Sequence, residues 1–245
     1  MTQEPKLLYL PTVDSTNRWA KENPDRLAPL GAVWTTCQTA GRGRLGRAWN
    51  NASGQGLYYT LMYQCPMAQP SALPLFASLA AADALEELFR ARVQIKWPND
   101  LLLGGKKIAG ILCEARNGAI FCGIGVNLCQ PRAYFEAENL PHGTSLALEG
   151  CPMNMESAPG RLAARLTRHL TGESFEAFAQ KGFAPLAPGY RSRCVNLGRA
   201  VTFDGGRGVA QTVDDEGRLV VRTEEGDTAV FTGEVSVKGI YGALE

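Results

Sequence analysis

Residues 38–49 read Q-T-A-G-R-G-R-L-G-R-A-W, and the rest of the chain is organised around this stretch. Three glycines alternate with three arginines, and Trp49 closes the run. Glycines at this density indicate unusual backbone dihedrals or close approach to a ligand. Guanidinium groups match carboxylate and phosphate oxygens, and an aromatic ring is suited to cover a flat group. The pattern occurs once, between apolar strand-like runs. We therefore interpret it as an anion-binding loop, rather than as a solvated basic loop or a disordered RNA-binding segment.

The composition is that of an ordinary globular protein. The chain has 245 residues, of which 45% are hydrophobic and 20% are charged, and its formal net charge is +1. This balance disfavours broad electrostatic adhesion to nucleic acid or to an anionic membrane. No apolar run approaches the roughly 20 residues of a membrane helix, and the N-terminus lacks the pattern of a signal peptide. We therefore expect a cytoplasmic protein with no nucleic-acid partner and no membrane partner.

The cysteines and histidines show neither a disulfide framework nor a metal site. The seven cysteines are scattered without a C-x-x-C pair, and their number is odd, which favours reduced thiols. His142 and His169 have no metal-like spacing, and we expect structural roles for both. We accordingly predict no metal site made by the protein itself.

Hydrophobic periodicity predicts a mixed α+β domain in the first part of the chain. Polar residues at 14–17 are suited to cap a helix. The clearest hairpin signal joins 107–114 to 119–128 through Asn117-Gly118, a dipeptide favoured in tight primed turns. Further strands are expected at 7–10, 32–36, 56–64 and 92–97, and helices at 71–90, 158–170 and 175–183. Residues 129–157 are predicted to form an irregular loop.

The composition changes at Pro185–Pro188. From Val195 onwards, five short strand-like runs are separated by turns at 205–206, 214–217 and 224–227. Such a series of short strands is typical of a small β-barrel. We therefore divide the chain into residues 1–188 and residues 189–245.

Three further stretches carry chemistry-bearing residues. They are K-W-P-N-D at 96–100, G-K-K-I-A-G at 105–110 and G-I-G-V-N at 123–127. The two glycines of the last stretch lie on one face of a strand, where a flat ligand can press against the backbone. Each stretch alone also fits a structural role, because lysines at strand ends are often exposed and an asparagine can cap a turn.

Together and in this order, these motifs resemble the biotin–protein ligase family. D-S-T-N at 14–17 lies upstream, and G-E-V-S-V-K at 233–238 lies near the C-terminus, so the resemblance covers nearly the whole chain. It implies a mixed-sheet catalytic domain over 1–188, flanked by helices and similar to class II aminoacyl-tRNA synthetases. Residues 189–245 would form an SH3-like β-barrel. The motifs begin within the first fifteen residues, so we expect the monofunctional form without an N-terminal DNA-binding domain.

The resemblance implies a two-step reaction that consumes ATP with Mg²⁺. The carboxylate of biotin attacks the α-phosphate of ATP, which yields biotinyl-5′-adenylate and pyrophosphate. A lysine of the biotin carboxyl carrier domain of a biotin-dependent carboxylase then attacks the mixed anhydride. The carrier domain is thus the implied partner, and the protein itself is expected to be a monomer or a homodimer.

The resemblance also assigns three catalytic roles, to Lys107, Arg44 and Asp100. Lys107 would touch both the biotin carboxyl and the α-phosphate, and the K-I-A-G register favours it over Lys106. Arg44 would help to close the loop over biotin and phosphate. Asp100 is the candidate for positioning the acceptor amine.

Two larger sets are implied to bind the substrates. The biotin-binding set is Ser15, Thr16, Asn17, Gln38, Gly41, Arg42, Arg44, Lys107, Gly110, Gly123 and Gly125. The nucleotide-binding set is Arg42, Arg44, Arg47, Trp49, Lys96, Asn99, Lys107 and Asn127. The cations in these sets would lower the repulsion between an anionic carboxylate and an anionic phosphate.

Two positions depart from the pattern of the biotin–protein ligase family. Leu45 stands where many relatives carry arginine, and Lys238 stands where some carry arginine.

Two other functions compete with that of a biotin–protein ligase. A lipoate–protein ligase or octanoyltransferase shares the catalytic architecture but lacks the glycine-arginine loop and K-W-P-N-D. A nucleic-acid-binding regulator would need a basic stripe with stacking aromatics, which this sequence lacks.

Overall fold

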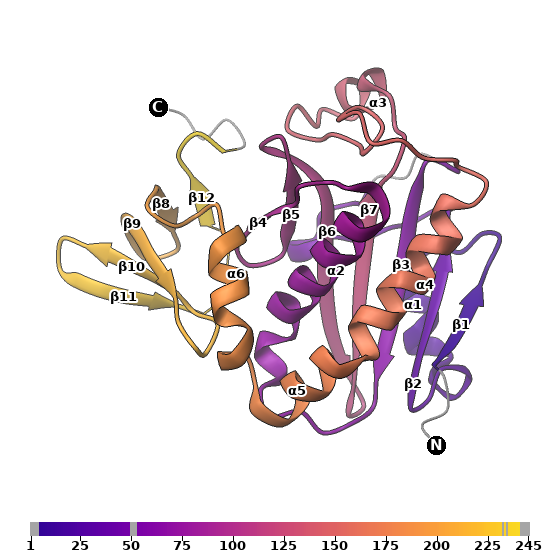
Figure 1. The fold of residues 1–245 in the computed structure, drawn as a ribbon, viewed down its shortest axis with the longest axis horizontal. Coiled ribbons are helices and arrows are strands. Elements are labelled where there is room, and N and C mark those ends of the chain that lie inside the picture. Colours follow the sequence, from indigo (N-terminus) through magenta and orange to yellow (C-terminus); the bar gives the residue numbers. More distant parts are fainter. Residues whose placement is uncertain (1–4, 50–52, 232, 234, 241–245) are drawn as a thin grey trace.

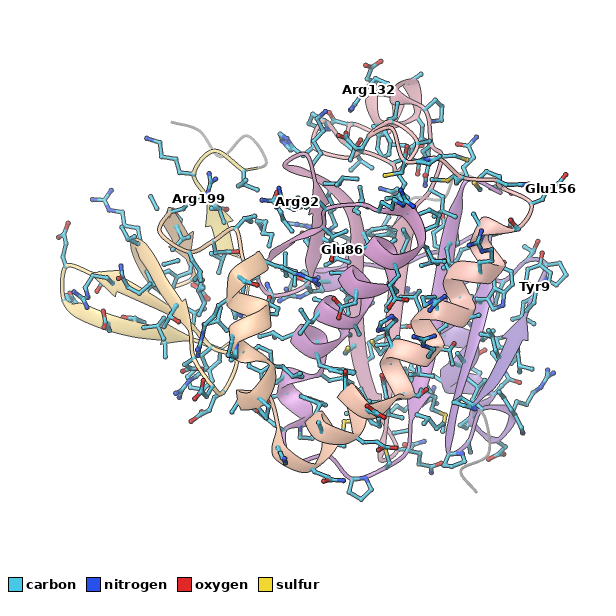
Figure 2. All side chains as sticks on the ribbon, viewed as in Figure 1. Tyr9, Glu86, Arg92, Arg132, Glu156 and Arg199 are labelled. Atoms are coloured by element: carbon cyan, nitrogen blue, oxygen red, sulfur yellow. The ribbon has the colours of Figure 1, made fainter. Side chains whose placement is uncertain are left out.

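The computed structural model describes residues 5–49, 53–231, 233 and 235–240, and Figure 1 shows its architecture. Glu234, within the C-terminal G-E-V-S-V-K stretch, lies outside the described residues. A large sheet with helices on both faces carries a smaller sheet at one end (Figure 1), and side chains fill the space between the sheet and the helices (Figure 2). Within the described part of the chain, no helix has both the length and the apolar character to cross a membrane.

The large sheet has seven strands in the order β1-β2-β3-β7-β6-β5-β4. Only β1 and β2 pair in parallel, and the other neighbours are antiparallel, so the predicted mixed sheet is confirmed. The strand predicted over 92–97 is shorter, and a separate strand follows it directly after the Pro98 turn. The strands are β1 (Lys6–Tyr9), β2 (Leu30–Thr35), β3 (Gly56–Tyr63), β4 (Gln94–Lys96), β5 (Asp100–Leu103), β6 (Lys106–Arg116) and β7 (Ala119–Asn127).

The hairpin of β6 and β7 forms as the sequence predicts. Asn117 has φ of 51° and Gly118 has φ of 76°, the left-handed values that a primed two-residue turn requires. This turn fixes the register of the two strands, and Gly110 consequently lies opposite Gly125. Because side chains alternate between the two faces of a strand, the glycines of the hairpin share the face opposite to the one that packs on α2.

The helices cover the two faces of the large sheet. α1 (Thr16–Glu22) begins at Ser15, whose side chain accepts a hydrogen bond from the Arg18 amide, as expected of an N-cap. α2 (Leu73–Phe89) is buried on most sides because α4 (Ala158–Thr171) and α6 (Ala187–Arg193) pack over it. α5 (Glu173–Lys181) continues from α4 and packs aromatic rings against α2.

Two short helices were not expected. α3 (Arg132–Ala137) lies inside the segment predicted to be an irregular loop, and that prediction is wrong for these residues. It has six residues and no side-chain cap, so it leaves little periodic signal in the sequence. α6 carries Pro188 in its first turn, where the missing amide hydrogen costs no helical hydrogen bond.

The C-terminal part forms a second sheet, in the order β11-β10-β9-β8-β12. The five strands confirm the small β-domain predicted after Val195. Over the described residues β11 and β12 stand at the two ends of the order and are not paired with each other. The strands are β8 (Ala200–Phe203), β9 (Gly206–Val213), β10 (Leu219–Thr223), β11 (Gly226–Val230) and β12 (Val235–Val237).

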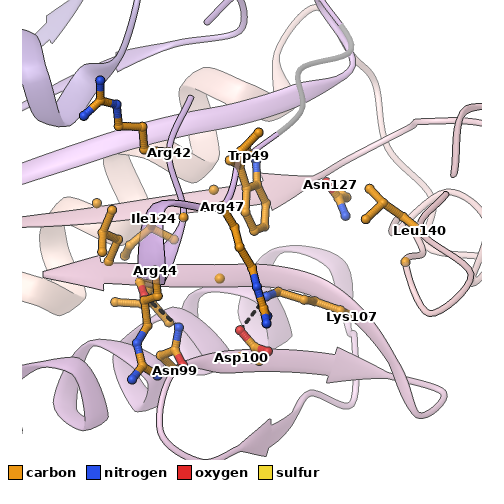
Figure 3. A pocket seen from close by; sticks show the side chains of 18 of the residues that line it. Arg42, Arg44, Arg47, Trp49, Asn99, Asp100, Lys107, Ile124, Asn127 and Leu140 are labelled. Atoms are coloured by element: carbon orange, nitrogen blue, oxygen red, sulfur yellow. Dashed lines mark hydrogen bonds and ion pairs between the residues drawn. The ribbon is translucent and has the colours of Figure 1, made fainter. Parts of the chain in front are cut away.

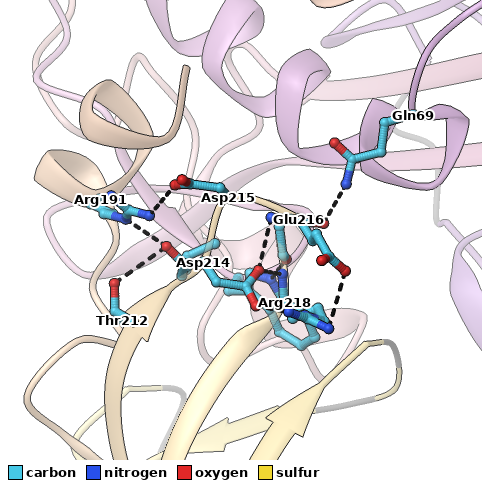
Figure 4. Close-up of polar contacts among 10 residues, drawn as sticks. Gln69, Arg191, Thr212, Asp214, Asp215, Glu216 and Arg218 are labelled. Carbon is cyan, nitrogen blue, oxygen red and sulfur yellow. Dashed lines mark hydrogen bonds and ion pairs between the residues drawn. The ribbon is translucent and has the colours of Figure 1, made fainter. Parts of the chain in front are cut away.

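The turn between β9 and β10 joins the two sheets (Figure 4). The Gln69 side chain donates to the Glu216 carbonyl at 2.7 Å, and Arg191 of α6 forms an ion pair with Asp215 at 2.8 Å. The buried indole of Trp97, within K-W-P-N-D, donates through Nε1 to the Gly217 carbonyl at 3.0 Å. The small sheet is thereby held against the strand that leads into the K-W-P-N-D turn.

We predict that Gly217→Val destabilises the protein more than Gly198→Val. Both glycines are left-handed, with φ of 81° and 75°, but a Cβ at 217 would lie 3.0 Å from Leu75 Cδ2, whereas a Cβ at 198 meets nothing within 4 Å. Overpacking of this kind typically costs about 1–3 kcal/mol beyond the shared backbone penalty. Urea unfolding of both variants measures the difference. Equal losses of unfolding free energy would show that the Gly217 turn does not pack tightly on the large sheet.

Candidate functional site

A cavity of about 530 Å³ lies on the glycine-bearing face of β6 and β7. The loop of residues 41–49 covers it, and residues 139–143 and the start of β12 complete its walls. Figure 3 shows this loop above the two strands, with the side chains of Arg42, Arg44, Arg47 and Trp49 around the opening.

Three glycines of β6 and β7 form the floor of the cavity, and the Trp49 ring and the Asn17 amide lie against them. A Cβ added at Gly110 would lie 2.8 Å from the Trp49 ring, and one added at Gly125 would lie 2.6 Å from it. A Cβ at Gly123 would collide with Asn17 Oδ1. Flat groups therefore rest directly on the strands, which only glycine permits at these three positions.

One end of the cavity is polar and buried. The Thr16 amide donates to Gln38 Oε1 at 2.9 Å, and the Thr16 hydroxyl donates to the same oxygen at 3.2 Å. The Thr60 hydroxyl lies 2.9 Å from Thr16 Oγ1 and 2.6 Å from Asn17 Oδ1. These side chains form one connected network, and each is less than a tenth exposed.

The other end of the cavity is cationic. Lys107 Nζ forms an ion pair with Asp100 at 2.6 Å and lies 5.4 Å from the centre of the Trp49 ring. The Arg47 side chain points from the loop toward this pair (Figure 3). Apart from Asp100, no carboxylate lines the cavity among the described residues. The cations that line it are Arg42, Arg44, Arg47, Lys96 and Lys107.

Arg44 fastens the covering loop to both sheets. Its Nη1 donates to Asn99 Oδ1 at 2.7 Å, and its Nη2 donates to the Gly233 carbonyl at 3.0 Å. Asn99 in turn donates to the Ile111 carbonyl at 2.9 Å. The loop also closes on itself, since the Gly43 amide donates to the Arg47 carbonyl. Arg44 therefore has a positioning role in this structure, in addition to its place in the cavity wall.

All the residues predicted for the site line the cavity, with the exception of Gly41. Gly41 instead accepts the Trp49 amide through its carbonyl, and a Cβ there would lie 2.5 Å from the Trp49 carbonyl. Lys106 points elsewhere and lies 3.7 Å from Glu149. The register that favours Lys107 over Lys106 is the one in which the side chain reaches the cavity.

Asn127 is held by protein groups on both sides of its amide. Its Nδ2 donates to the Thr144 carbonyl at 3.0 Å, and its Oδ1 accepts from Gln130 at 3.1 Å.

The sequence motifs did not include Thr60 or the segment 139–143, which contains Leu140 and His142. The His142 carbonyl accepts the Lys107 amide at 2.8 Å, and no motif in the sequence marks this contact.

Comparison with known proteins identifies the family. Residues 9–128 match the Biotin/lipoate A/B protein ligase family, and residues 197–238 match the Biotin protein ligase C terminal domain. The chain is 33% identical to the biotin–[acetyl-CoA-carboxylase] ligase of Paracoccus denitrificans over 94% of this chain and 100% of that protein. The chain belongs to the biotin protein ligase family.

Other biotin ligases are similar in sequence and in structure. The Bifunctional ligase/repressor BirA of Bacillus subtilis is 31% identical over 94% of this chain and 74% of its own length. The biotin protein ligase from Aquifex aeolicus in complex with biotin and ATP superimposes with a TM-score of 0.79 and 29% identity, covering 95% of this chain and 98% of that one. The mixed α+β fold is thus that of the biotin ligases.

We predict that Gly125→Ala displaces the Trp49 indole, since the added methyl would lie 2.6 Å from the ring. Acrylamide quenching of tryptophan fluorescence should increase in the variant. The increase should vanish when both proteins also carry Trp49→Phe, which removes the reporter. Gly189→Ala is the control, because Gly189 is not left-handed and a Cβ there meets only Leu79 Cδ2, at the ordinary contact distance of 3.8 Å. Unchanged quenching in Gly125→Ala would contradict the contact between the ring and the floor.

Proposed function

We propose that this protein is an ATP-dependent biotin–protein ligase, which forms biotinyl-5′-adenylate and transfers biotin to a lysine of a biotin carboxyl carrier domain. The cavity has a buried polar end, a floor of glycines and a cationic end, and this arrangement supports the proposal. Biotin has a cyclic urea at one end and a carboxylate at the other, which matches this polarity. The cationic end then faces the nucleotide.

The polar end suits the ureido ring. The ring carries two N–H donors and one carbonyl acceptor, and buried polar groups on either partner are costly if left unpaired. Ser15, Thr16, Asn17 and Gln38 supply both donors and acceptors there. Asn17 and Trp49 lie against the backbone at Gly123 and Gly125, and the fused rings would bind beside these two side chains.

The cationic end supports the first step. A carboxylate and a phosphate repel each other, and preorganised cations at their meeting point lower the barrier. Lys107, beside Asp100 and over the floor, is the cation we assign to both groups. Arg42, Arg47 and Lys96 would receive the remaining phosphate charge, and Trp49 would cover the adenine. Mg²⁺ enters bound to ATP as part of the substrate, and no group of three or more His, Cys, Asp or Glu side chains in the described chain is arranged to hold a metal by itself.

The second step needs a neutral amine. A lysine amine has a pKa near ~10.4, so only about one part in a thousand is neutral near physiological pH. Asp100 is the carboxylate at this end of the cavity and would receive the acceptor ammonium once Lys107 turns to the adenylate. The loop fastened by Arg44 would meanwhile exclude water from the mixed anhydride.

We assign residues 1–188 to a catalytic domain similar to class II aminoacyl-tRNA synthetases, and residues 189–245 to an SH3-like barrel. α6 spans this border and packs against both α2 and β9. We also propose that the reaction takes place in the cytoplasm, without a nucleic-acid or membrane partner, by a monomer or a homodimer.

We expect the full chain to attach biotin, and not lipoate, to a biotin carboxyl carrier domain in the presence of ATP and Mg²⁺. Mass spectrometry of the carrier domain after incubation with each acid reports the product directly, and reactions without ATP are the control. Lipoate lacks the urea that the polar end would bind. Attachment of lipoate alone would contradict the proposal and favour a lipoate ligase.

We expect Lys107→Ala to slow biotin-dependent pyrophosphate release by about two to three decades, because one preorganised charge contact to the transition state is lost. Lys106→Ala is the matched control, since Lys106 lies outside the cavity and pairs weakly with Glu149 at 3.7 Å. It should retain nearly all the activity. The opposite order of the two variants would show that the wrong lysine has been assigned.

A further inference from the structure

Behind the polar end of the cavity lies a carboxylate that no motif includes. Glu114 Oε2 accepts a hydrogen bond from Asn17 Nδ2 at 2.8 Å, and Glu114 Oε1 forms an ion pair with Lys21 at 2.9 Å. Asn17 and Lys21 are one turn apart on α1, so the helix presents both to the same carboxylate. Glu114 itself is on β6, on the same face as Gly110.

The Asn17 amide has only one orientation that satisfies these partners. Its Nδ2 donates to Glu114 and also to the Leu112 carbonyl at 3.2 Å, which uses both amide hydrogens. Its Oδ1 accepts from the Thr60 hydroxyl at 2.6 Å and lies over Gly123, on the floor of the cavity. A flipped amide would direct hydrogens at the floor and an oxygen at the carboxylate, which would repel it.

Thr60 links Asn17 to the rest of the network. Its hydroxyl is the donor to Asn17 Oδ1 at 2.6 Å and to Thr16 Oγ1 at 2.9 Å. The Thr16 hydroxyl donates in turn to Gln38 Oε1, and the Thr16 amide donates to the same oxygen. The Gln38 amide therefore presents Nε2, its donor, on the side of the covering loop, where a Cβ at Gly41 would collide with it.

We propose that Glu114 is a positioning residue for biotin, which fixes the orientation of the Asn17 amide and so the order of donors and acceptors that the ureido ring meets. The proposal rests on the assignment of biotin as the substrate of this cavity. Glu114 does not line the cavity and acts through Asn17.

The charge of Glu114 is maintained by its neighbours. Burial alone would raise the pKa of this carboxyl, but hydrogen bonds from Lys21 and Asn17, with the charges of Lys21 and Arg42, hold its pKa below the ordinary value. The carboxylate is therefore ionised at neutral pH. Hydrogen bonds to an ionised acceptor are stronger than those to a neutral one, so the amide is held more firmly than a neutral side chain would hold it.

Glu114→Gln tests this role. The variant keeps the size of the side chain but removes the charge, and it offers an amide that can pair with Asn17 in either orientation. We expect its KM for biotin to rise about five- to tenfold, the ratio that separates a charged from a neutral hydrogen bond, with KM for ATP nearly unchanged. Pyrophosphate release measures both constants, and the wild-type reaction run alongside shows that biotin is the substrate at all.

Lys21→Met is the matched control, because it breaks the ion pair and leaves the bond between Glu114 and Asn17. Because Asn17 still donates to the Glu114 carboxylate in this variant, its KM for biotin should rise clearly less than in Glu114→Gln. In an Asn17→Ala background, Glu114→Gln should have no further effect on KM for biotin. Thermal unfolding of each variant confirms that it is folded.

Three outcomes would overturn the proposal while wild-type biotin activation is intact. One is an unchanged KM for biotin in Glu114→Gln, and another is an equal rise in KM for biotin and for ATP. The third is the same rise in Lys21→Met as in Glu114→Gln, which would mean that the ion pair merely supports the fold. If Glu114→Gln does not fold, the same comparison is made with Glu114→Asp, whose shorter side chain keeps the charge but loses the contact and should raise KM for biotin alone.

Discussion

The site depends on the absence of side chains on one face of a β-hairpin. Gly110 lies opposite Gly125 across β6 and β7, and Gly123 follows on the same face. Because no Cβ projects there, the Trp49 ring and the Asn17 amide can rest on the strands themselves. The Asn117-Gly118 turn keeps the glycines in register, since a slip of one residue would bring side chains to the floor.

The second constraint is charge. Biotin and ATP are both anions, and the cavity meets them with five cations and, among the described residues, one carboxylate. Asp100 and Lys107 neutralise each other at 2.6 Å, so both charges have a partner in a partly buried place. Two hydrogen bonds attach the C-terminal sheet to the turn that carries Asp100. The Trp97 indole donates to the Gly217 carbonyl, and Arg44 donates to the Gly233 carbonyl. The small domain thereby supports the geometry of the cationic end.

Local patterns predicted most of the elements, and the family resemblance named site residues that, except for Gly41, all line the cavity. The Asn-Gly turn, the capping Ser15 and the glycines of the hairpin act through near neighbours in the chain, and such signals can be read from one sequence. Contacts between distant segments cannot be read in this way. Thr60, Glu114 and His142 reach the site through hydrogen bonds from other elements, and none belongs to a motif. The short α3 and α6 were missed because they lack a periodic apolar stripe.

The motifs also did not reveal that several of their residues make hydrogen bonds within the protein itself. Arg44, Asn99 and Asn127 all line the cavity, yet each makes hydrogen bonds within the protein that hold the walls together. Part of the function of these side chains is therefore to shape the cavity. Substitutions at these positions combine loss of substrate contact with loss of structure, and their kinetic effects need to be separated accordingly.

We expect the loop of residues 41–49 to close more firmly over the glycine floor when biotinyl-5′-adenylate binds. Hydrogen exchange measured by mass spectrometry, with and without biotinyl-5′-adenylate, tests this closure. The amides in 41–49 should exchange markedly more slowly with the ligand, because the bound anion adds contacts to the clustered arginines. The helix α2 lies on the opposite face and should exchange equally in both states. Equal exchange of residues 41–49 with and without the ligand, or slowing confined to other segments, would show that the loop does not close over the adenylate.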